Sequence, residues 1–557
     1  MRFTILLLLF GASSAAAQDS SYIVERNVQM RMRDGGTVCA LIVRPPTPPR
    51  LAALLTFTIY VDSTQNLAEA RRAAANGYAG IVGYTRGKAC SPDTPVPYRY
   101  DGADAAALID WIATQSWSDG RVGMYGGSYS GFTTWAAARH RPKALKAIMV
   151  GAPAAPAVDV PMEGNIVWNF IYQWPFYTTN NKTLDNATYF DNARWRRLSR
   201  EWYTSGRAYR DLDKIDGTPN PVFNEWISHS SYDAYWRDMI PSAAEFAKID
   251  IPVLQTAGYF WGGPGAAQYY FDQHYAHNPA ARHYLIIGPY NHPQAQRGVV
   301  NARGDTARIL GGYQIDSVAR IDIVAELRYR WFDWVLKSGP RPRLLEDRVN
   351  YQVMGANVWK HAPSIKAMSD STLRVPLGPE RALRFDLAYR GDIDSTFPGG
   401  GIRDSALNTY GALEYVSEPL QNSTEVSGLF RGHLEFTTNK RDVDLSILLF
   451  ELTTAGEYFQ FPPFQQRMSY RRDPSKRRLL TPGGRETLEF TSRVLFSRRM
   501  ARGSRVVVVV GPIKGPGQQI NYGSGKEVND ETVADAGEPL EIRFLAGSYV
   551  ELPIRTP

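Results

Sequence analysis

The stretch that decides the fold reads VGMYGGSYSG and spans residues 122–131. A short apolar strand leads into two glycines and Ser128, and a helical run follows. Gly126 and Gly131 permit the tight turn that lifts a serine hydroxyl out of a sheet, and the next amide can donate to an oxyanion. The motif departs by one residue from Gly-x-Ser-x-Gly, and a glycine-rich loop is the alternative. The strand before it and the helix after it favour a nucleophile elbow, with Ser128 as the nucleophile.

The segments around this motif alternate strands and helices, which is typical of an α/β sheet. Before residue 155, strands are predicted at 37–43, 53–59, 79–84, 122–125 and 147–150, and a helix over 101–115. The alternation stops over 155–246, where Trp, Tyr, Asn and Arg are frequent, and this part is predicted to be an inserted helical cap. It resumes with strands at 252–257 and 283–287, a helix near 266–274 and a long helix over 317–337.

The residues after this last helix change in composition. The run SGPRP at 338–342 reads as a linker. Short β-rich runs separated by Gly, Pro and Asn turns follow at 348–353, 445–453, 505–510 and 549–554, and they predict a β-sandwich. We therefore predict an α/β-hydrolase fold over 18–154 and 247–340, with a cap at 155–246 and an all-β domain at 341–557.

The first 17 residues have the features of a signal peptide. Arg2 precedes an apolar run over 3–10, and small residues ending in Ala-x-Ala occupy 11–17. No stretch reaches the roughly 20 apolar residues of a membrane-spanning helix. We expect cleavage after Ala17 and a periplasmic or secreted protein. In such an oxidising compartment Cys39 and Cys90 can form one disulfide, and two separate buried thiols are the alternative.

Charge and composition exclude several kinds of partner. The net charge is +8 at pH 7, and the basic residues are dispersed, so no nucleic-acid partner is expected. The sequence holds no His-Glu-x-x-His, no Cys-x-x-Cys and no spaced cluster of His and carboxylates, so we expect neither a metal nor another cofactor. Formation of a homo-oligomer stays open.

Three motifs occur together: GGSYSG at 126–131, WSDGRVGM at 117–124 and TRG at 85–87. With them the chain resembles the cocaine-esterase and X-Pro dipeptidyl-peptidase-like hydrolases, which include α-amino acid ester hydrolases and glutaryl cephalosporin acylases. The resemblance covers nearly the whole chain after residue 17 and implies that the β domain is a jelly roll. It also implies an oxyanion hole made by the Tyr129 amide and the Tyr60 hydroxyl. Without the resemblance, Tyr60 reads as a core tyrosine.

The general base is predicted from chain order, in which the histidine follows the last strand of the fold. His292 lies there in Gly-Pro-Tyr-Asn-His, which matches the Gly-Pro-x-x-His of the family. His283 in a strand and His274 in a helix are interpreted as structural or exposed. Histidine suits this role because its unperturbed pKa lies near neutrality.

The catalytic acid is where the sequence departs from the family. The position that the family fills with aspartate is Trp261, and Asn291 stands where a related pattern has aspartate. Neither can stabilise an imidazolium by charge. An acid from another loop, a Ser-His dyad or a decayed site would each explain this. Asp159 and Glu163 are the candidates for a relocated acid, with Asp272 less favoured.

Three functions are compatible with these residues. The first is an exported hydrolase of small acyl esters or amides, with the aromatic cap shaping the acyl pocket. The second is an X-Pro dipeptidyl aminopeptidase, which needs a carboxylate pair such as one containing Glu163 to hold a free α-ammonium. The third is a binding protein or pseudoenzyme in which the triad is a relic.

Overall fold

The computed structural model describes residues 21–46, 50–260, 264–299, 309–391, 401–407, 409 and 411–555. The predicted signal peptide at 1–17 and Trp261 lie outside these residues. In the described part of the chain, no helix combines the length and apolar character that crossing a membrane requires.

A ten-stranded sheet of described strands forms the centre of the larger domain, in the order β1-β2-β4-β3-β5-β6-β9-β10-β13-β14. The strands from β4 to β13 along this order run parallel. Their bounds are β1 Ile23–Arg31, β2 Thr37–Arg44, β3 Leu51–Thr58, β4 Ala79–Tyr84, β5 Ser118–Ser128, β6 Leu145–Pro153, β9 Val253–Gly258, β10 His283–Gly288, β13 Val349–Val353 and β14 Val358–Ala362. Every residue of β4 and β9 is buried, as expected for parallel strands covered on both faces.

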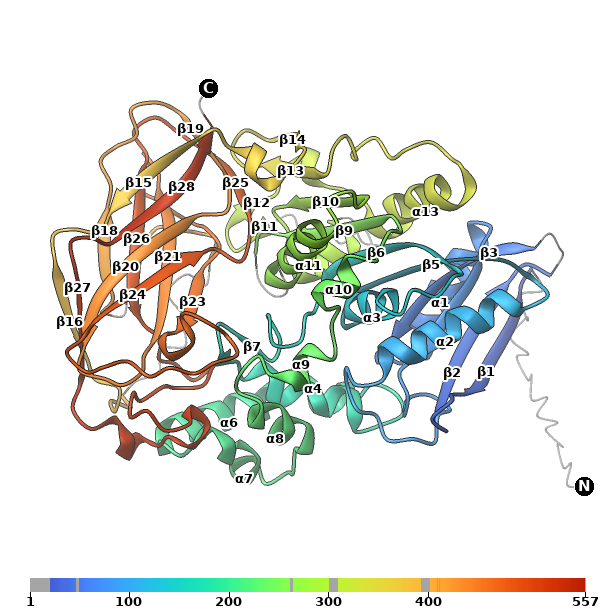
Figure 1. Cartoon of the computed structure of the whole chain (residues 1–557), viewed down its shortest axis with the longest axis horizontal. Helices are drawn as coiled ribbons and strands as arrows, with labels where there is room; N and C mark the ends of the chain where they lie inside the picture. Colours follow the sequence, from blue (N-terminus) through green and yellow to red (C-terminus); the bar gives the residue numbers. More distant parts are fainter. Residues whose placement is uncertain are drawn as a thin grey trace, which may run out of the picture.

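Helices cover both faces of this sheet (Figure 1). They include α1 Ser63–Ala75, α2 Asp101–Thr114, α3 Tyr129–Ala138, α11 Pro264–His277 and α13 Arg328–Lys337. The strands predicted before residue 155, the helix at 101–115 and the strands at 252–257 and 283–287 are all confirmed, with ends shifted by a few residues.

The predicted long helix at 317–337 is wrong in its first half. A 3₁₀ turn, Ser317–Ala319, comes first, then a π-helical turn, Ile323–Leu327, and only then α13. Asp316 accepts hydrogen bonds from the amides of two residues after it, and Asp322 accepts one from the Ala325 amide. These carboxylates cap two separate starts, which breaks the continuous helix that the apolar pattern suggested.

The predicted start of the β domain at 341 is also wrong. The run at 348–353 forms β13, which pairs in parallel with β10, with Leu285 opposite Val349. β14 then pairs antiparallel with β13 and forms the edge of the large sheet. A β-rich run has the same pattern in either sheet, so its partner strand is decided by tertiary packing.

The cap contains seven short helices between β6 and β9 (Figure 1). They are α4 Phe170–Thr179, α5 Asn186–Tyr189, α6 Asn192–Ser205, α7 Leu212–Asp216, α8 Pro221–Ser228, α9 Ala234–Arg237 and α10 Ala243–Phe246, preceded by a hairpin of β7 Met162–Glu163 and β8 Ile166–Val167. The sequence predicted this helical insertion.

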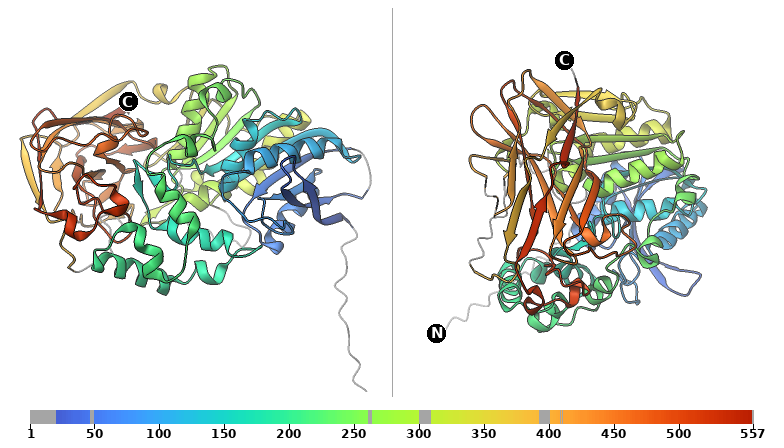
Figure 2. Two further views of the ribbon diagram at one scale, coloured as in Figure 1. Left: turned by 60° about the horizontal axis from the view of Figure 1, so that its bottom comes forward. Right: turned by 60° about the vertical axis from the view of Figure 1, so that its left-hand side comes forward.

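The C-terminal domain is a β-sandwich of two antiparallel sheets (Figure 2). One sheet contains β15 Ser371–Pro376, β16 Arg381–Phe385, β19 Thr424–Gly428, β20 Arg431–Thr438, β24 Arg485–Thr491, β25 Phe496–Met500, β27 Leu540–Phe544 and β28 Tyr549–Arg555. The other contains β17 Arg403–Asp404, β18 Leu413–Val416, β21 Asp444–Leu452, β22 Tyr458–Gln460, β23 Phe464–Arg467 and β26 Arg505–Pro512. In β24 buried and exposed residues alternate, which is the pattern of a sheet with one face in a core.

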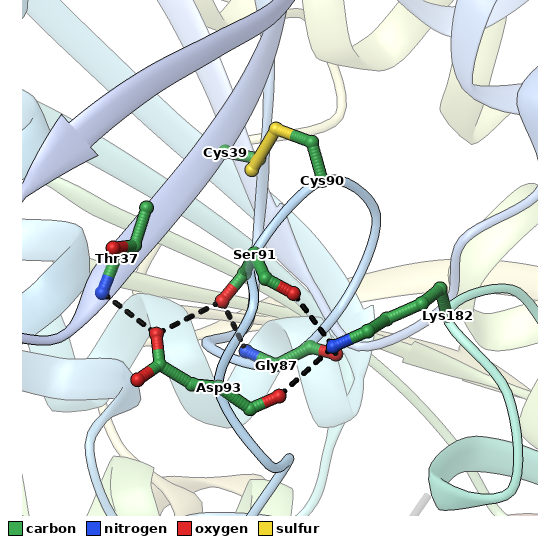
Figure 3. Close-up of a disulfide and its surroundings, with 7 residues drawn as sticks. All are labelled: Thr37, Cys39, Gly87, Cys90, Ser91, Asp93 and Lys182. Atoms are coloured by element: carbon green, nitrogen blue, oxygen red, sulfur yellow. Dashed lines mark hydrogen bonds between the residues drawn. A yellow bond between two sulfur atoms is a disulfide. The ribbon is translucent and has the colours of Figure 1, made fainter.

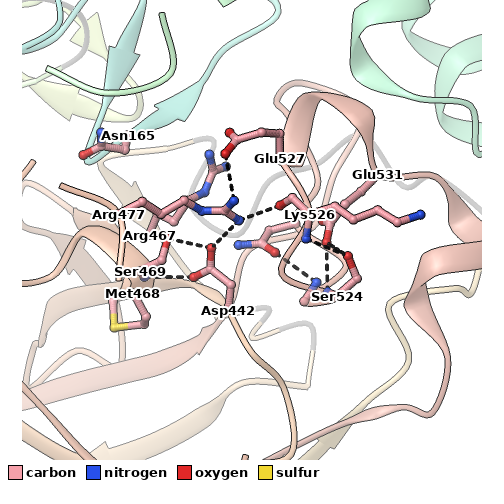
Figure 4. A network of polar contacts seen from close by, with 12 residues as sticks. Asn165, Asp442, Arg467, Met468, Ser469, Arg477, Ser524, Lys526, Glu527 and Glu531 are labelled. Atoms are coloured by element: carbon pink, nitrogen blue, oxygen red, sulfur yellow. Dashed lines mark hydrogen bonds and ion pairs between the residues drawn. The ribbon is translucent and has the colours of Figure 1, made fainter. Parts of the chain in front are cut away.

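A buried polar network lies within the β domain, beside the cap hairpin (Figure 4). Asp442 is fully buried and accepts from the Ser469 hydroxyl at 2.7 Å, and Arg477 lies 3.5 Å from it. The Arg467 guanidinium pairs with Asp444 at 2.8 Å, and its backbone amide donates to Gly164 in the hairpin. The paired charges hold segments of the β domain together, and the bond from the Arg467 amide to Gly164 joins that domain to the hairpin.

A disulfide joins the loop after β4 to β2, and two lysines join that loop to the cap; Figure 3 shows the disulfide and one of the lysines, Lys182. Cys39 and Cys90 are bonded, which decides the alternative that the sequence left open. Lys182 from the cap donates to the carbonyls of Gly87, Ser91 and Asp93. In return, Lys88 donates to three cap carbonyls, of Thr178, Asn181 and Thr183.

Reduction of the Cys39–Cys90 bond is expected to destabilise the protein. The bond joins residues 51 positions apart, and loop-closure entropy for a loop of that size amounts to about 4 kcal/mol of unfolding free energy. Urea denaturation of oxidised and reduced protein measures the difference, with the Cys39→Ser, Cys90→Ser double variant as the control that needs no reductant. Equal denaturation midpoints for all three would contradict the prediction.

Candidate active site

The strand, turn and helix predicted around Ser128 are confirmed. Ser128 ends β5 and precedes α3, with φ 57° and ψ −124°. Such a conformation is strained for a residue with a side chain and is found where the surrounding structure enforces it. A Cβ at Gly126 would lie 2.3 Å from the Ser130 carbonyl oxygen, and one at Gly131 would lie 2.9 Å from Pro153. The two glycines are therefore required by close packing of the turn.

Tyr60 lies beside the Ser128 side chain. It follows β3, and both Ser128 and the indole of Trp174 hydrogen-bond to its phenol oxygen, with the Trp174 Nε1 donating at 3.3 Å. Burial raises the pKa of Tyr60 to about 12, although these two hydrogen bonds lower it. The phenol therefore stays protonated at neutral pH and can donate a hydrogen bond to an oxygen atom next to Ser128.

Tyr129 directly follows Ser128, and its backbone amide is the second predicted oxyanion donor. It is the first residue of α3, and the first amides of a helix have no carbonyl partner within the helix. Its phenol donates to Asp101 at 2.7 Å and accepts from the Tyr98 amide at 3.0 Å, and its ring contacts the Tyr60 ring at a centroid distance of 6.1 Å. Ser128 thus has the Tyr60 phenol beside its side chain, and the Tyr129 amide follows it in the chain.

His292 begins the short helix α12, His292–Arg297, after β10. This helix packs against β5, β6 and β9. Gln296, one turn after His292 and on the same face, lies over the elbow, since a Cβ on Gly127 would come within 2.4 Å of its Oε1. The Gln296 side-chain amide also donates to the His292 carbonyl at 3.0 Å. The helix that begins at His292 is therefore packed against the elbow through Gln296.

Asn291, where a related pattern has aspartate, serves the backbone of α12. Its side-chain oxygen accepts from the Gln294 amide at 3.0 Å, and the Gln294 side chain accepts from the Asn291 amide at 3.1 Å. This reciprocal arrangement is a capping box. Asn291 thus fixes the start of the helix that carries His292.

Asp159 and Glu163, the two candidates for a relocated acid, lie together after β6. Burial raises the pKa of Asp159 to about 8, the Ala155 and Ala266 amides lower it, and the Glu163 charge raises it. A carboxyl group that is largely protonated at pH 7 is poorly suited to stabilising an imidazolium. Burial also raises the pKa of Glu163, which lies 3.9 Å from Arg493 of the β domain.

Asp272 and the other two histidines have local partners. Asp272 accepts from the Gln268 side chain one turn earlier in α11, at 2.9 Å. His274 and His283 are both fully buried, their Nδ1 atoms lie 3.2 Å apart, and burial lowers both pKa values. The interpretation of these histidines as structural is confirmed.

Among the described residues, no group of three or more His, Cys, Asp and Glu is placed to hold a metal ion.

Aromatic side chains from the cap surround the Tyr60 phenol. Trp174 and Tyr177 of α4 contact the Tyr60 ring at centroid distances of 6.4 Å and 6.0 Å, and Tyr177 stacks on Tyr189 at 4.3 Å. Burial raises the pKa of Tyr177, and the charge of Arg297 at the end of α12 opposes this rise, so α12 reaches the same region. Sequence analysis predicted an aromatic cap but missed Trp174 as a partner of Tyr60, because no motif links the two positions.

Comparisons with known proteins relate the chain to known hydrolases. Residues 34–294 match the family described as X-Pro dipeptidyl-peptidase (S15 family). The cocaine esterase of Rhodococcus sp. (strain MB1 Bresler) is 26% identical over 435 residues, which cover 74% of this chain and 71% of that protein.

Two solved structures share the fold over the whole chain. An α-amino acid ester hydrolase is 20% identical with a TM-score of 0.76, covering 97% of this chain and 98% of its own. An aminopeptidase from the marine sediment archaeon Thaumarchaeota archaeon is 18% identical with a TM-score of 0.80, covering 100% of this chain and 99% of its own. These two structures show the fold alone, whereas the family match over residues 34–294 and the cocaine esterase relative identify the chain as a serine hydrolase similar to the X-Pro dipeptidyl-peptidases and cocaine esterases.

Proposed function

We propose that the protein hydrolyses small acyl esters or amides through an acyl-enzyme on Ser128. His292 is the general base, and the Tyr60 hydroxyl and the Tyr129 amide form the oxyanion hole. The observation that carries the proposal is the contact between the Tyr60 phenol and the Ser128 side chain. A phenol with a pKa of about 12 is a hydrogen-bond donor held where the carbonyl oxygen of a substrate would lie.

The reaction follows from these positions. Ser128 Oγ attacks the substrate carbonyl while His292 takes its proton, and the carbonyl oxygen becomes an oxyanion between Tyr60 and Tyr129. The tetrahedral intermediate collapses, His292 protonates the leaving alcohol or amine, and the acyl group stays on Ser128. Water, deprotonated by His292, then attacks the ester and releases the acid and free Ser128.

The cap supports a substrate with a small, partly apolar acyl group. Trp174, Tyr177 and Tyr189 place aromatic rings around the oxyanion donor Tyr60. Aromatic walls with a few fixed polar groups are typical of small-molecule sites. Because the Asp159 carboxyl is largely protonated at pH 7, we propose that Ser128 and His292 act as a dyad rather than with this residue as the third member.

Turnover of a panel of p-nitrophenyl esters, together with labelling by a serine-directed phosphonate, tests the proposal. We expect hydrolysis of short-chain esters and mass addition on the peptide that contains Ser128. Neither turnover nor labelling on any member of the panel would favour the binding-protein alternative over an active enzyme.

An aminopeptidase activity is the second candidate, and the Asp159–Glu163 pair favours it. The two carboxyl groups lie close enough for the Glu163 charge to raise the pKa of Asp159, after the larger effect of burial, and Arg493 is the cation near Glu163. A substrate α-ammonium would lower the pKa of Asp159 and bind the resulting carboxylate, because an opposite charge favours the ionised form. The match to the X-Pro dipeptidyl-peptidase family also supports this candidate.

Paired substrates separate the two candidates. An amino acid p-nitrophenyl ester and its N-acetyl form differ only in the ammonium group. An aminopeptidase would prefer the free amine and lose that preference in Glu163→Gln, whereas a simple acyl esterase would hydrolyse both forms with similar kcat/KM.

We also propose that the protein is exported, with cleavage after Ala17 leaving Gln18 as the first residue. The Cys39–Cys90 disulfide supports this proposal, because such bonds persist in oxidising compartments. The N-terminal sequence of the protein recovered from periplasm and medium is the test, and an intact Met1 in the cytoplasmic fraction would contradict it.

A further inference from the structure

A buried carboxylate lies behind the elbow and takes no part in the reaction steps above. Asp101 is the first residue of α2 and is 1% exposed. Its Oδ2 accepts from the Tyr129 phenol at 2.7 Å, and its Oδ1 accepts from the Thr85 hydroxyl at 2.6 Å. Burial raises the pKa of Asp101 to about 6, while these two hydrogen bonds lower it. The group is therefore ionised at neutral pH, although its two side-chain partners are neutral.

One branch of this network leads to the amide of the oxyanion hole. The Tyr129 phenol is held at its far end by Asp101 and by the Tyr98 amide. Tyr129 itself is 1% exposed, so both ends of the residue are fixed. The amide at its near end follows the strained backbone of Ser128, whose φ is 57°, and a tethered side chain limits relaxation of that peptide.

The other branch leads to Tyr60. Besides the bond from its hydroxyl to Asp101, Thr85 donates its amide to the Thr58 carbonyl at 2.9 Å. The Thr58 hydroxyl oxygen in turn accepts from the Tyr60 amide at 3.0 Å. Asp101 is thus connected through Thr85 and Thr58 to the residue that supplies the phenol.

The neighbouring carboxylate, Asp104, forms an ordinary ion pair. Asp104, one turn later in α2, binds the Arg86 guanidinium through two bonds of 2.6 Å and 3.1 Å. Asp101 carries a negative charge like the oxyanion and cannot stabilise it by attraction. It therefore contributes to catalysis by holding the oxyanion donors in position. Burying a charge whose hydrogen-bond partners are neutral hydroxyls destabilises the fold. The compensating benefit is that the two oxyanion donors, Tyr60 and Tyr129, are held in place.

We propose that Asp101 is a positioning residue that sets both oxyanion donors, Tyr129 directly and Tyr60 through Thr85 and Thr58. This inference rests on the proposed function of Ser128, Tyr60 and Tyr129. It adds a residue from α2 that contacts neither the substrate nor the reacting atoms.

Replacement Asp101→Ala removes both acceptors and is expected to lower kcat for a p-nitrophenyl ester by about 10- to 100-fold, since small displacements of catalytic groups have effects of that size. KM should stay within about twofold, because the donors act on the transition state. Asp101→Asn keeps one acceptor oxygen and should recover most of kcat. Asp110→Asn, on the exposed face of the same helix, is the matched control.

Tyr129→Phe supplies a second and independent test, because it removes one branch while keeping the backbone amide. We expect Tyr129→Phe to lower kcat. The double variant Tyr129→Phe, Asp101→Ala should be no slower than Asp101→Ala alone, because both changes break the same branch. If Asp101→Ala does not fold, Tyr129→Phe and Thr85→Val each test one branch. Unchanged kcat in every folded variant, or KM and kcat altered together, would overturn the proposal.

Ser128→Ala in the same assay distinguishes the two possible failures. An inactive Ser128→Ala beside a fully active Asp101→Ala would refute only the positioning role. A fully active Ser128→Ala would refute the proposed function, and the positioning role with it.

Discussion

The Ser128→Ala variant is expected to lose ester hydrolysis by a factor on the order of 10⁴ to 10⁶ in kcat, the cost of removing a nucleophile in serine hydrolases. The reason is structural, because Ser128 is the residue that the strained turn between β5 and α3 presents to the Tyr60 phenol. Steady-state kinetics on the best ester of the panel measures the loss, and phosphonate labelling of the variant should disappear with it.

The second serine of the motif offers a matched control. Ser130 lies in α3, is 6% exposed and forms part of the same turn, so Ser130→Ala tests damage to the elbow without removing the nucleophile. We expect it to retain activity within a few-fold. His292→Ala should be as inactive as Ser128→Ala, and the double variant no worse, because the two residues act as a unit. Equal activity of Ser128→Ala and Ser130→Ala would exclude Ser128 as the nucleophile.

The Tyr60→Phe variant is expected to show the next largest effect. Removing one oxyanion donor costs about 10²- to 10³-fold in kcat, or roughly 3–4 kcal/mol of transition-state stabilisation. The ring and its packing against Trp174 remain in the variant, so KM should change little. Because burial raises the pKa of Tyr60 to about 12, the wild-type phenol keeps its proton through pH 10, and the loss should be the same across that range.

Tyr284→Phe is the control for removing a phenol elsewhere. Tyr284 lies in β10 and packs on Trp331 and Trp334, away from the elbow. Its activity should equal that of the wild type. A Tyr60→Phe enzyme with wild-type kcat would show that the second oxyanion donor is another group.

Much of the fold was predictable because periodicity and turn residues are local signals. The strands on both sides of the elbow, the helix at 101–115 and the position of the cap follow from short-range pattern. The two errors, the long helix at 317–337 and the start of the β domain at 341, come from interactions that the apolar pattern of the sequence does not record. Asp316 and Asp322 each cap a separate turn before α13, and β13 takes β10 as its partner.

The candidate site likewise contains residues that the sequence predicted and residues that it did not. The elbow motif predicted Ser128 as the nucleophile, and chain order predicted His292 as the base, because strand-to-helix turns and loop order are properties of the sequence. Tyr60 was reached through family resemblance alone. Trp174 and Asp101 were missed as its supports, since they join loops that are far apart in the chain.

By itself, the sequence determined the class of fold, the elbow and the order of the candidate catalytic residues, since glycines at a turn and apolar periodicity act over a few residues. Only the tertiary structure decided that Cys39 and Cys90 are bonded, that the Asp159 carboxyl is buried with a raised pKa, and that Asp101 links Tyr129 to Thr85. The physical reason is that burial, pKa and hydrogen-bond partners depend on which distant segments pack together.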